Sequence, residues 1–225
     1  MPEFEYVSHS KAQPIKNGII DLIHRVQNDI REYFTLDYHF VGSSSRNMIT
    51  REKNGNKGFD FDVNLIPNVY NDEYSAAEIR RFVLDSLQRR MKKYGYTDIE
   101  DSTSVITIKV VVGDRVIRSC DFAIVRTNIY GKQQYIHFDK YQIPFYFQTG
   151  YSWRDRGGLY DIEEKLQWIE VNKFKQVLRD QYLKNKNRNF DRNKESRTIF
   201  AETVNNIYNQ FNNRGLIYPF RMGLF

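Results

Sequence analysis

Hydrophobic residues recur at helical spacing in two segments of the first half of the chain, residues 14–34 and 76–94. Pro14 suits the first turn of the earlier segment. Ser75 and Glu78 have the spacing of a capping box at the start of the later one. We therefore predict an amphipathic helix in each segment.

Runs rich in β-branched and aromatic residues lie between and after these helices and predict strands. The Gly113-Asp114 pair between two of the runs predicts a hairpin turn. Residues 51–58 are polar and glycine-rich, so we expect a flexible loop there. The expected strands are residues 38–41, 59–66, 105–112, 115–125 and 133–138.

After residue 150 the hydrophobic pattern is helical again, and a polar loop is expected before the last helix. This order of elements predicts the α+β class, with a mixed β-sheet core flanked by helices and a helical C-terminal lobe. We assign residues 1–150 to the core and residues 151–225 to the lobe. The expected helices of the lobe are residues 160–171, 173–186 and 195–212, and the expected loop is residues 185–194.

The chain of 225 residues has a net charge of +6, and its distribution is uneven. Residues 1–150 hold 20 basic and 19 acidic side chains, whereas residues 173–197 hold nine basic and three acidic ones. A concentrated positive field favours a phosphate-bearing partner and predicts a nucleic-acid contact through residues 173–197. A solvated helix face is the alternative interpretation of the same charges.

Several classes of protein are excluded by composition. Cys120 is the single cysteine, which excludes an internal disulfide and a cysteine-based zinc site. No run of 18 apolar residues exists, so we expect no membrane-spanning helix and no membrane partner. The acidic N-terminus has no signal-peptide pattern, and we expect a cytoplasmic protein.

Three aspartates carry the candidate chemistry. Asp60 and Asp62 alternate along one predicted strand, so they share a face. Asp121 lies on another strand, where Phe122 favours the core and Asp121 the opposite face. If the two strands are neighbours, three carboxylates converge and suit one or two metal ions about 3.5–4 Å apart.

A second candidate group lies upstream, where a strand runs into Gly42 and Ser43. Glycine permits close approach of a phosphate, and the serine hydroxyl can donate a hydrogen bond to it. A short helix over residues 44–50 would add free N–H groups. Arg46 is expected to contact the phosphates as well.

The order of these motifs resembles the DNA polymerase β-like nucleotidyltransferase superfamily. Its signature places Gly-Gly or Gly-Ser before an apolar-Asp-apolar-Asp strand and a third carboxylate on a later strand, as in Val41-Gly42-Ser43, Phe59-Asp60-Phe61-Asp62-Val63 and Cys120-Asp121-Phe122. The resemblance covers about residues 36–126. One departure is the spacer of 16 residues between Ser43 and Asp60, which is longer than usual in the family and contains the polar loop.

The resemblance implies a metal-dependent enzyme that transfers a nucleoside monophosphate from a nucleoside triphosphate to a hydroxyl acceptor and releases pyrophosphate. Asp60, Asp62 and Asp121 would be catalytic and would bind Mg²⁺ or Mn²⁺. Asp121 would also help to deprotonate the acceptor. Gly42 and Ser43 would hold the phosphates.

In relatives that include 2′-5′-oligoadenylate synthases and bacterial cyclic-oligonucleotide synthases, a lysine of the helical lobe contacts the triphosphate. Lys184 is the candidate here, with Lys173 and Lys175 as rivals. Tyr151 or Trp153 could stack on the base, with core packing as the alternative role.

Other functions remain open at this stage. A catalytically silent module with the same fold, and an RNA-binding or RNA-extending protein, are alternatives to an enzyme; a glycosyltransferase fits the motifs poorly. The sequence does not determine the base, the product or the acceptor, which ranges from a nucleotide or RNA end to a protein hydroxyl or a small molecule.

Overall fold

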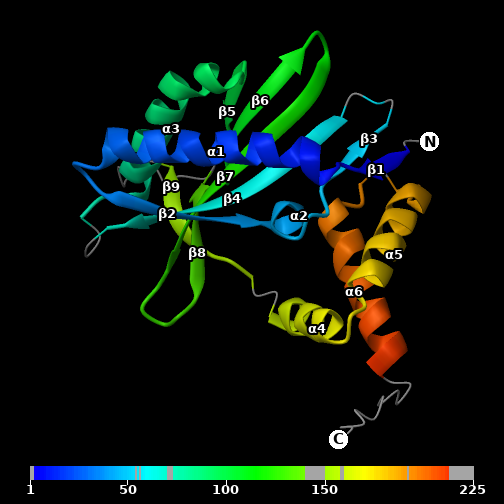
Figure 1. Cartoon of the computed structure of the whole chain (residues 1–225). Helices are drawn as coiled ribbons and strands as arrows, with labels where there is room; N and C mark the ends of the chain where they lie inside the picture. The colour runs from blue at the N-terminus through cyan, green and yellow to red at the C-terminus, as the bar shows by residue number, and fades with distance from the viewer. Residues whose placement is uncertain are drawn as a thin grey trace, which may run out of the picture. The chain divides into compact units, whose positions relative to one another are not determined.

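The computed structural model describes residues 3–53, 55, 57–69, 73–139, 150–157, 160–191 and 193–212, and the chain divides into two compact units, residues 2–157 and 158–225. The first unit holds the sheet and two long helices. The second is helical (Figure 1).

The first unit is built on a mixed sheet with the strand order β2-β4-β7-β6-β5. Strands β4 and β7 are parallel neighbours, and the other pairs are antiparallel. Strand β8 pairs with the end of β7, and β9 pairs with β8. The bounds are β2 Thr35–Val41, β4 Lys57–Asn68, β5 Asp98–Asp101, β6 Ile106–Val112, β7 Arg115–Thr127, β8 Gln133–Phe138 and β9 Tyr151–Asp155. A separate two-stranded sheet pairs β1 (Phe4–Tyr6) with β3 (Thr50–Glu52).

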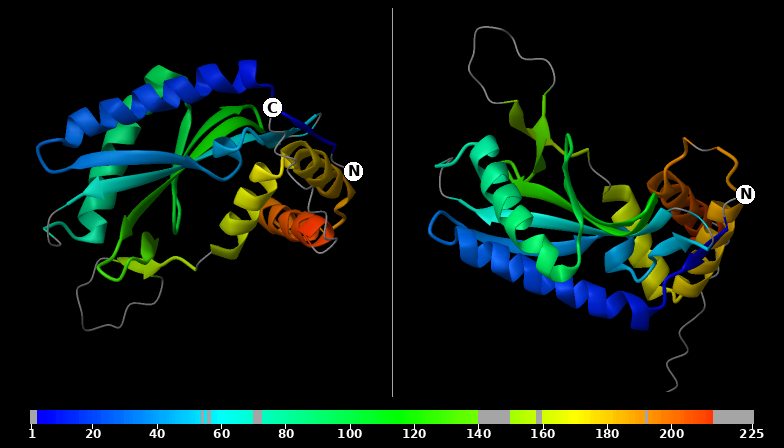
Figure 2. Two further views of the ribbon diagram at one scale, coloured as in Figure 1. Left: turned by 60° about the horizontal axis from the view of Figure 1, so that its bottom comes forward. Right: turned by 90° about the horizontal axis from the view of Figure 1, so that it is seen from above.

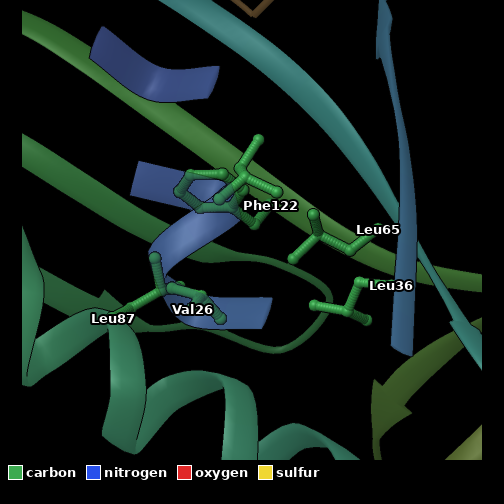
Figure 3. Close-up of a pocket in the computed structure, with 6 residues that line it drawn as sticks. Val26, Leu36, Leu65, Leu87 and Phe122 are labelled. Atoms are coloured by element: carbon green, nitrogen blue, oxygen red, sulfur yellow. The ribbon is translucent and has the colours of Figure 1, made fainter. Parts of the chain in front are cut away.

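Helices α1 (His9–Ile30) and α3 (Ala76–Arg90) lie against one face of this sheet (Figure 2). Their apolar stripes meet Phe61 and Phe122, whose side chains are completely buried. A small gap at this contact is lined only by core side chains (Figure 3). It has no space for a water molecule, so it is a packing gap of the core and not a ligand site.

Both predicted helices exist, and the ends of the first are shifted. Helix α1 begins at His9, because Ser8 adopts extended backbone and its carbonyl accepts the first helical hydrogen bonds, so Pro14 lies inside the helix. Helix α3 starts with the predicted capping box and continues as the 3-10 helix η1 (Met91–Tyr94), which ends at Gly95 with φ +76°. The predicted hairpin at Gly113 is confirmed as β6 and β7.

Strands β1 and β3 were not predicted, and three further points of the strand prediction need correction. Strand β4 begins at Lys57, so the polar loop predicted over residues 51–58 is shorter, and two of its residues, 54 and 56, lie outside the described residues. Strand β5 is a charged edge strand that the pattern did not indicate. Strand β9 belongs to the sheet unit, because it pairs with β8 along its whole length.

The second unit contains α4 (Tyr160–Val171), α5 (Lys175–Arg188) and α6 (Ser196–Asn212), which confirms the three predicted helices. Helix α5 extends into the predicted polar loop. Phe174 stacks between Trp168 of α4 and Phe211 of α6, so aromatic rings join the helices. None of the helices in the described part of the chain combines the length and apolar character needed to cross a bilayer.

Candidate active site

Asp60 and Asp62 lie on the face of β4 opposite α1 and α3. Their neighbours Phe59 and Phe61 and the following Val63 are buried in the core, so strand alternation turns both carboxylates the other way. Asp60 is exposed, whereas Asp62 is half-buried. The predicted shared face of the two aspartates is confirmed.

Asp121 lies directly beside Asp62. Strands β4 and β7 run parallel in a register that pairs Asp62 with Asp121, and Asp60 with Ser119. Cys120 and Phe122 on either side of Asp121 are fully buried. The prediction of three carboxylates depended on β4 and β7 being neighbours, and they are. The acids come from these two central strands of the sheet.

Two hydroxyl groups that the sequence did not indicate hold these carboxylates. Thr107 of β6 donates a hydrogen bond to Asp121 Oδ1 at 2.7 Å. Ser119 of β7 donates a short hydrogen bond to Asp60 Oδ1. Both donors occupy the register positions beside their acceptors, so each carboxylate is oriented by the neighbouring strand.

The clustered charges raise the pKa of the central acid. Burial raises the pKa of Asp62 to about 6, and repulsion from Asp121 and Asp60 adds to this. Arg46 and Arg156 act in the opposite direction. Burial also raises the pKa of Asp121, against the hydrogen bond from Thr107. Such displaced pKa values concentrate at functional sites, although structural charge clusters show them too.

The backbone at Gly42 closes against this cluster. Gly42 has φ +63°, and an added Cβ would lie 2.8 Å from Asp62 Oδ2. The positive φ favours glycine, and an added Cβ would require the carboxylate of Asp62 to move. Gly42 begins a single helical turn, α2 (Gly42–Ser45). The short helix considered over residues 44–50 does not form, because Arg46 and Asn47 leave helical geometry, with φ +55° at Asn47.

Ser44, rather than Ser43, fastens this turn to the site strand. Its hydroxyl donates to the carbonyl of Val41 at 2.6 Å and lies 3.1 Å from the carbonyl of Asp62. The Ser43 carbonyl accepts from Met48 N–H, which closes the loop. Ser43 itself is half-buried beside Gly42, where the sequence placed a phosphate-binding hydroxyl.

Arg46 follows the turn and is half-buried near Asp62. Arg156 is the cation that sequence reasoning missed. It follows β9, and its guanidinium lies 3.4 Å from Asn64 Oδ1, two residues beyond Asp62 on β4. In the sequence, Arg156 is followed by Gly157 and Gly158, a stretch that indicates only a break between elements. Its neighbour Asn64 is 92 residues away.

Other predicted residues lie elsewhere. Lys184 is exposed on α5, in the second unit. Tyr151 donates its hydroxyl to Asp101 at 2.7 Å and packs against Arg80. Trp153 packs against Arg126. These contacts give both aromatic residues packing roles.

The donor set at the carboxylate face suits a hard divalent cation, since all the candidate ligands are oxygen atoms. In the described residues, however, no three acidic, histidine or cysteine side chains are gathered as a metal site. The hydrogen bonds of Asp60 and Asp121 turn an oxygen of each towards a neighbouring hydroxyl. The residue types fit a metal, and side-chain rotation would be needed to bring them together around it.

Comparisons with known proteins support the fold. No protein-family model and no curated protein matches the sequence. The structure is similar to the DncV cyclic AMP-GMP synthase of Vibrio cholerae in complex with nonhydrolyzable GTP, with a TM-score of 0.57, 12% identity and 89% of this chain covered. The 3′-deoxy GTP bound form of DncV from Escherichia coli gives a TM-score of 0.53 at 12% identity, again over 89% of this chain.

This chain matches 52% and 53% of those two DncV chains, so it spans about half their length. At this level of identity the likeness concerns the fold alone. It confirms the α+β class, with a mixed sheet flanked by helices as in these DncV structures.

Proposed function

We propose, from the premise of a nucleotidyltransferase fold, that the carboxylate face of β4 and β7 is a divalent-cation-dependent nucleotidyltransferase site. The substrate would be a nucleoside triphosphate. The product would carry a nucleoside monophosphate on a hydroxyl of the acceptor.

The observation that carries this proposal is the pairing of Asp62 with Asp121 beside Gly42. Two half-buried acids on adjacent strands repel each other, and burial and this repulsion raise the pKa of Asp62. A scaffold gains nothing from that arrangement. A site that receives cations together with a triphosphate does, because the cations remove the repulsion.

Asp60, Asp62 and Asp121 would hold one or two Mg²⁺ or Mn²⁺ ions. When bound, the ions would neutralise charge on the triphosphate and on the leaving pyrophosphate. Gly42 lets the phosphates approach the backbone, Ser43 would donate a hydrogen bond to them, and Arg46 would balance their charge.

In the proposed step, the acceptor oxygen forms a bond to the α-phosphorus while the bond from that phosphorus to the β-phosphate bridging oxygen breaks. Pyrophosphate leaves with the electron pair. The acceptor proton passes to the carboxylate of Asp121, which acts as the general base of the proposed step, and from there to solvent.

The second unit supplies the remaining parts of the proposal. We keep Lys184 as the candidate triphosphate ligand, and residues 173–197 as the candidate nucleic-acid contact; Arg192 in that segment lies outside the described residues. A cytoplasmic location stays a prediction.

The test is pyrophosphate release from a mixture of the four nucleoside triphosphates with Mg²⁺, with and without an RNA oligonucleotide. We expect release by the wild type and its loss by orders of magnitude in Asp62→Asn and Asp121→Asn. The matched control is Asp85→Asn, because Asp85 is an exposed acid on α3, on the opposite side of the sheet. Equal release by the wild type and Asp62→Asn would contradict the proposed site.

A further inference from the structure

Arg156 is fixed at the carboxylate face by two separate elements. Its backbone N–H donates to the carbonyl of Gln133 at 2.8 Å. Its Nη1 lies 3.0 Å from Gln133 Oε1 and 3.4 Å from Asn64 Oδ1. Strand β8 thus holds the residue at its backbone, and β4 and β8 together hold its guanidinium.

Asn64 continues the row that Asp60 and Asp62 begin. It shares their face of β4 by strand alternation, and only 6% of its surface is exposed. A buried amide in a sheet requires hydrogen-bond partners. Its contact with Arg156 places a guanidinium at the end of the row of site residues, close enough to Asp62 to lower the pKa of that acid.

The two arginines near Asp62 come from opposite flanks of the β4–β7 strand pair. Arg46 and Gly42 follow β2, which pairs with one edge of β4. Arg156 and Gln133 come from β8 and β9, and β8 pairs with β7, the strand on the other side of β4. The Asp62–Asp121 pair lies between these two sides.

In-line displacement requires the attacking and leaving oxygens on opposite sides of the phosphorus. If the triphosphate lies at Gly42 and Arg46, the pyrophosphate leaves towards β2. The acceptor must then arrive from the side of β7 and β8, where Asp121 and Arg156 lie.

We propose that Arg156, held by Asn64 and Gln133, binds a phosphate group of the acceptor and so selects acceptors that carry one. The inference rests on the proposed function and assigns Arg156 to specificity. A guanidinium presents paired N–H donors that match phosphate oxygens, whereas an uncharged alcohol offers it no comparable partner.

The test measures binding and needs no turnover. The protein is first titrated by calorimetry with a nonhydrolysable analogue of each of the four nucleoside triphosphates in the presence of Mg²⁺. It is then saturated with the analogue that binds most tightly and titrated with each of the four nucleosides and with its 5′-monophosphate. For the wild type we expect at least one pair in which the monophosphate binds about tenfold to a hundredfold more tightly, the range for a charge-assisted hydrogen bond.

In Arg156→Gln we expect that preference to fall to near one, with nucleoside affinity unchanged. Arg156→Lys keeps the positive charge but lacks the paired N–H donors of the guanidinium, and it is expected to retain part of the preference. The control is Arg154→Gln, which removes an exposed arginine of β9 that lies two residues before Arg156 and is paired with Asp139 at 2.5 Å. It is expected to keep the full preference.

A full preference in Arg156→Gln overturns the inference, as does equal binding of nucleoside and monophosphate by the wild type. Failure of the proposed function is recognised separately, because the wild type would then bind none of the four triphosphate analogues with Mg²⁺ in the first titration. Circular dichroism of each variant establishes that it is folded.

Discussion

Replacing Asp62 by Asn is expected to stabilise the protein at neutral pH in the absence of divalent cations. Asn has nearly the same shape, and the hydrogen bonds between Ser44 and the backbone of Asp62 do not involve the replaced group. The substitution removes the charge that burial, Asp121 and Asp60 disfavour. A residue kept for folding alone would not behave in this way.

The pKa of Asp62 rises from 3.8 to about 6 on folding. About 2 pH units at about 1.36 kcal/mol each give a cost of about 3 kcal/mol for ionising the folded protein. The folded state binds the proton more tightly, so the cost is absent below about pH 4, grows between pH 4 and 6, and is complete above that range.

Thermal unfolding in EDTA from pH 4 to 8 measures the effect. Wild type and Asp62→Asn should have the same melting temperature near pH 4. At pH 7.5 the melting temperature of Asp62→Asn should be about 6–12 °C higher, because 1 kcal/mol corresponds to about 2–4 °C for a chain of this size. Asp85→Asn should change little at either pH, because it is an exposed acid away from the site. An Asn variant that is less stable than the wild type at pH 7.5, or equally stabilised at both pH values, would refute the reasoning.

Three further substitutions test individual contacts. Gly42→Ala should lose about 1–3 kcal/mol in urea unfolding, because φ is +63° and the new Cβ would lie 2.8 Å from Asp62; a neutral result would show that the loop adapts. Thr107→Val should raise the pKa of Asp121, because the hydrogen bond from Thr107 lowers it. NMR of the carboxyl group measures this pKa, and an unchanged or lower value would be inconsistent with that bond. Phe122→Ala should cost about 3–5 kcal/mol of stability, since the ring is wholly buried, and a loss under 1 kcal/mol would contradict the described core.

The carboxylate row was predictable because its signals are local. Alternation along a strand decides which way Asp60 and Asp62 turn, and the buried Phe122 decides the direction of Asp121. Gly42 was predicted to lie at the site because glycine permits close approach of a phosphate, and its positive φ is a second reason for glycine that the sequence did not show.

Other parts of the site depend on contacts distant in the sequence. Arg156 meets Asn64 over 92 residues and Ser119 meets Asp60 over 59, and no spacing rule connects them. Strands β5 and β9 escaped prediction for a related reason. Each is short and polar or charged, and its strand state comes from pairing with a neighbour rather than from its own pattern.

The most direct measurement of the central claim is thermal unfolding of the wild type with each of the four nucleoside triphosphates, with and without Mg²⁺. No acceptor is needed. A ligand at a hundred times its dissociation constant stabilises the folded state by about 2.7 kcal/mol. That corresponds to a rise of about 5–10 °C. The account predicts such a rise for at least one triphosphate, only with Mg²⁺, and its absence in the Asp60→Asn/Asp62→Asn double variant. No rise with any triphosphate, or an equal rise in the double variant, would contradict it.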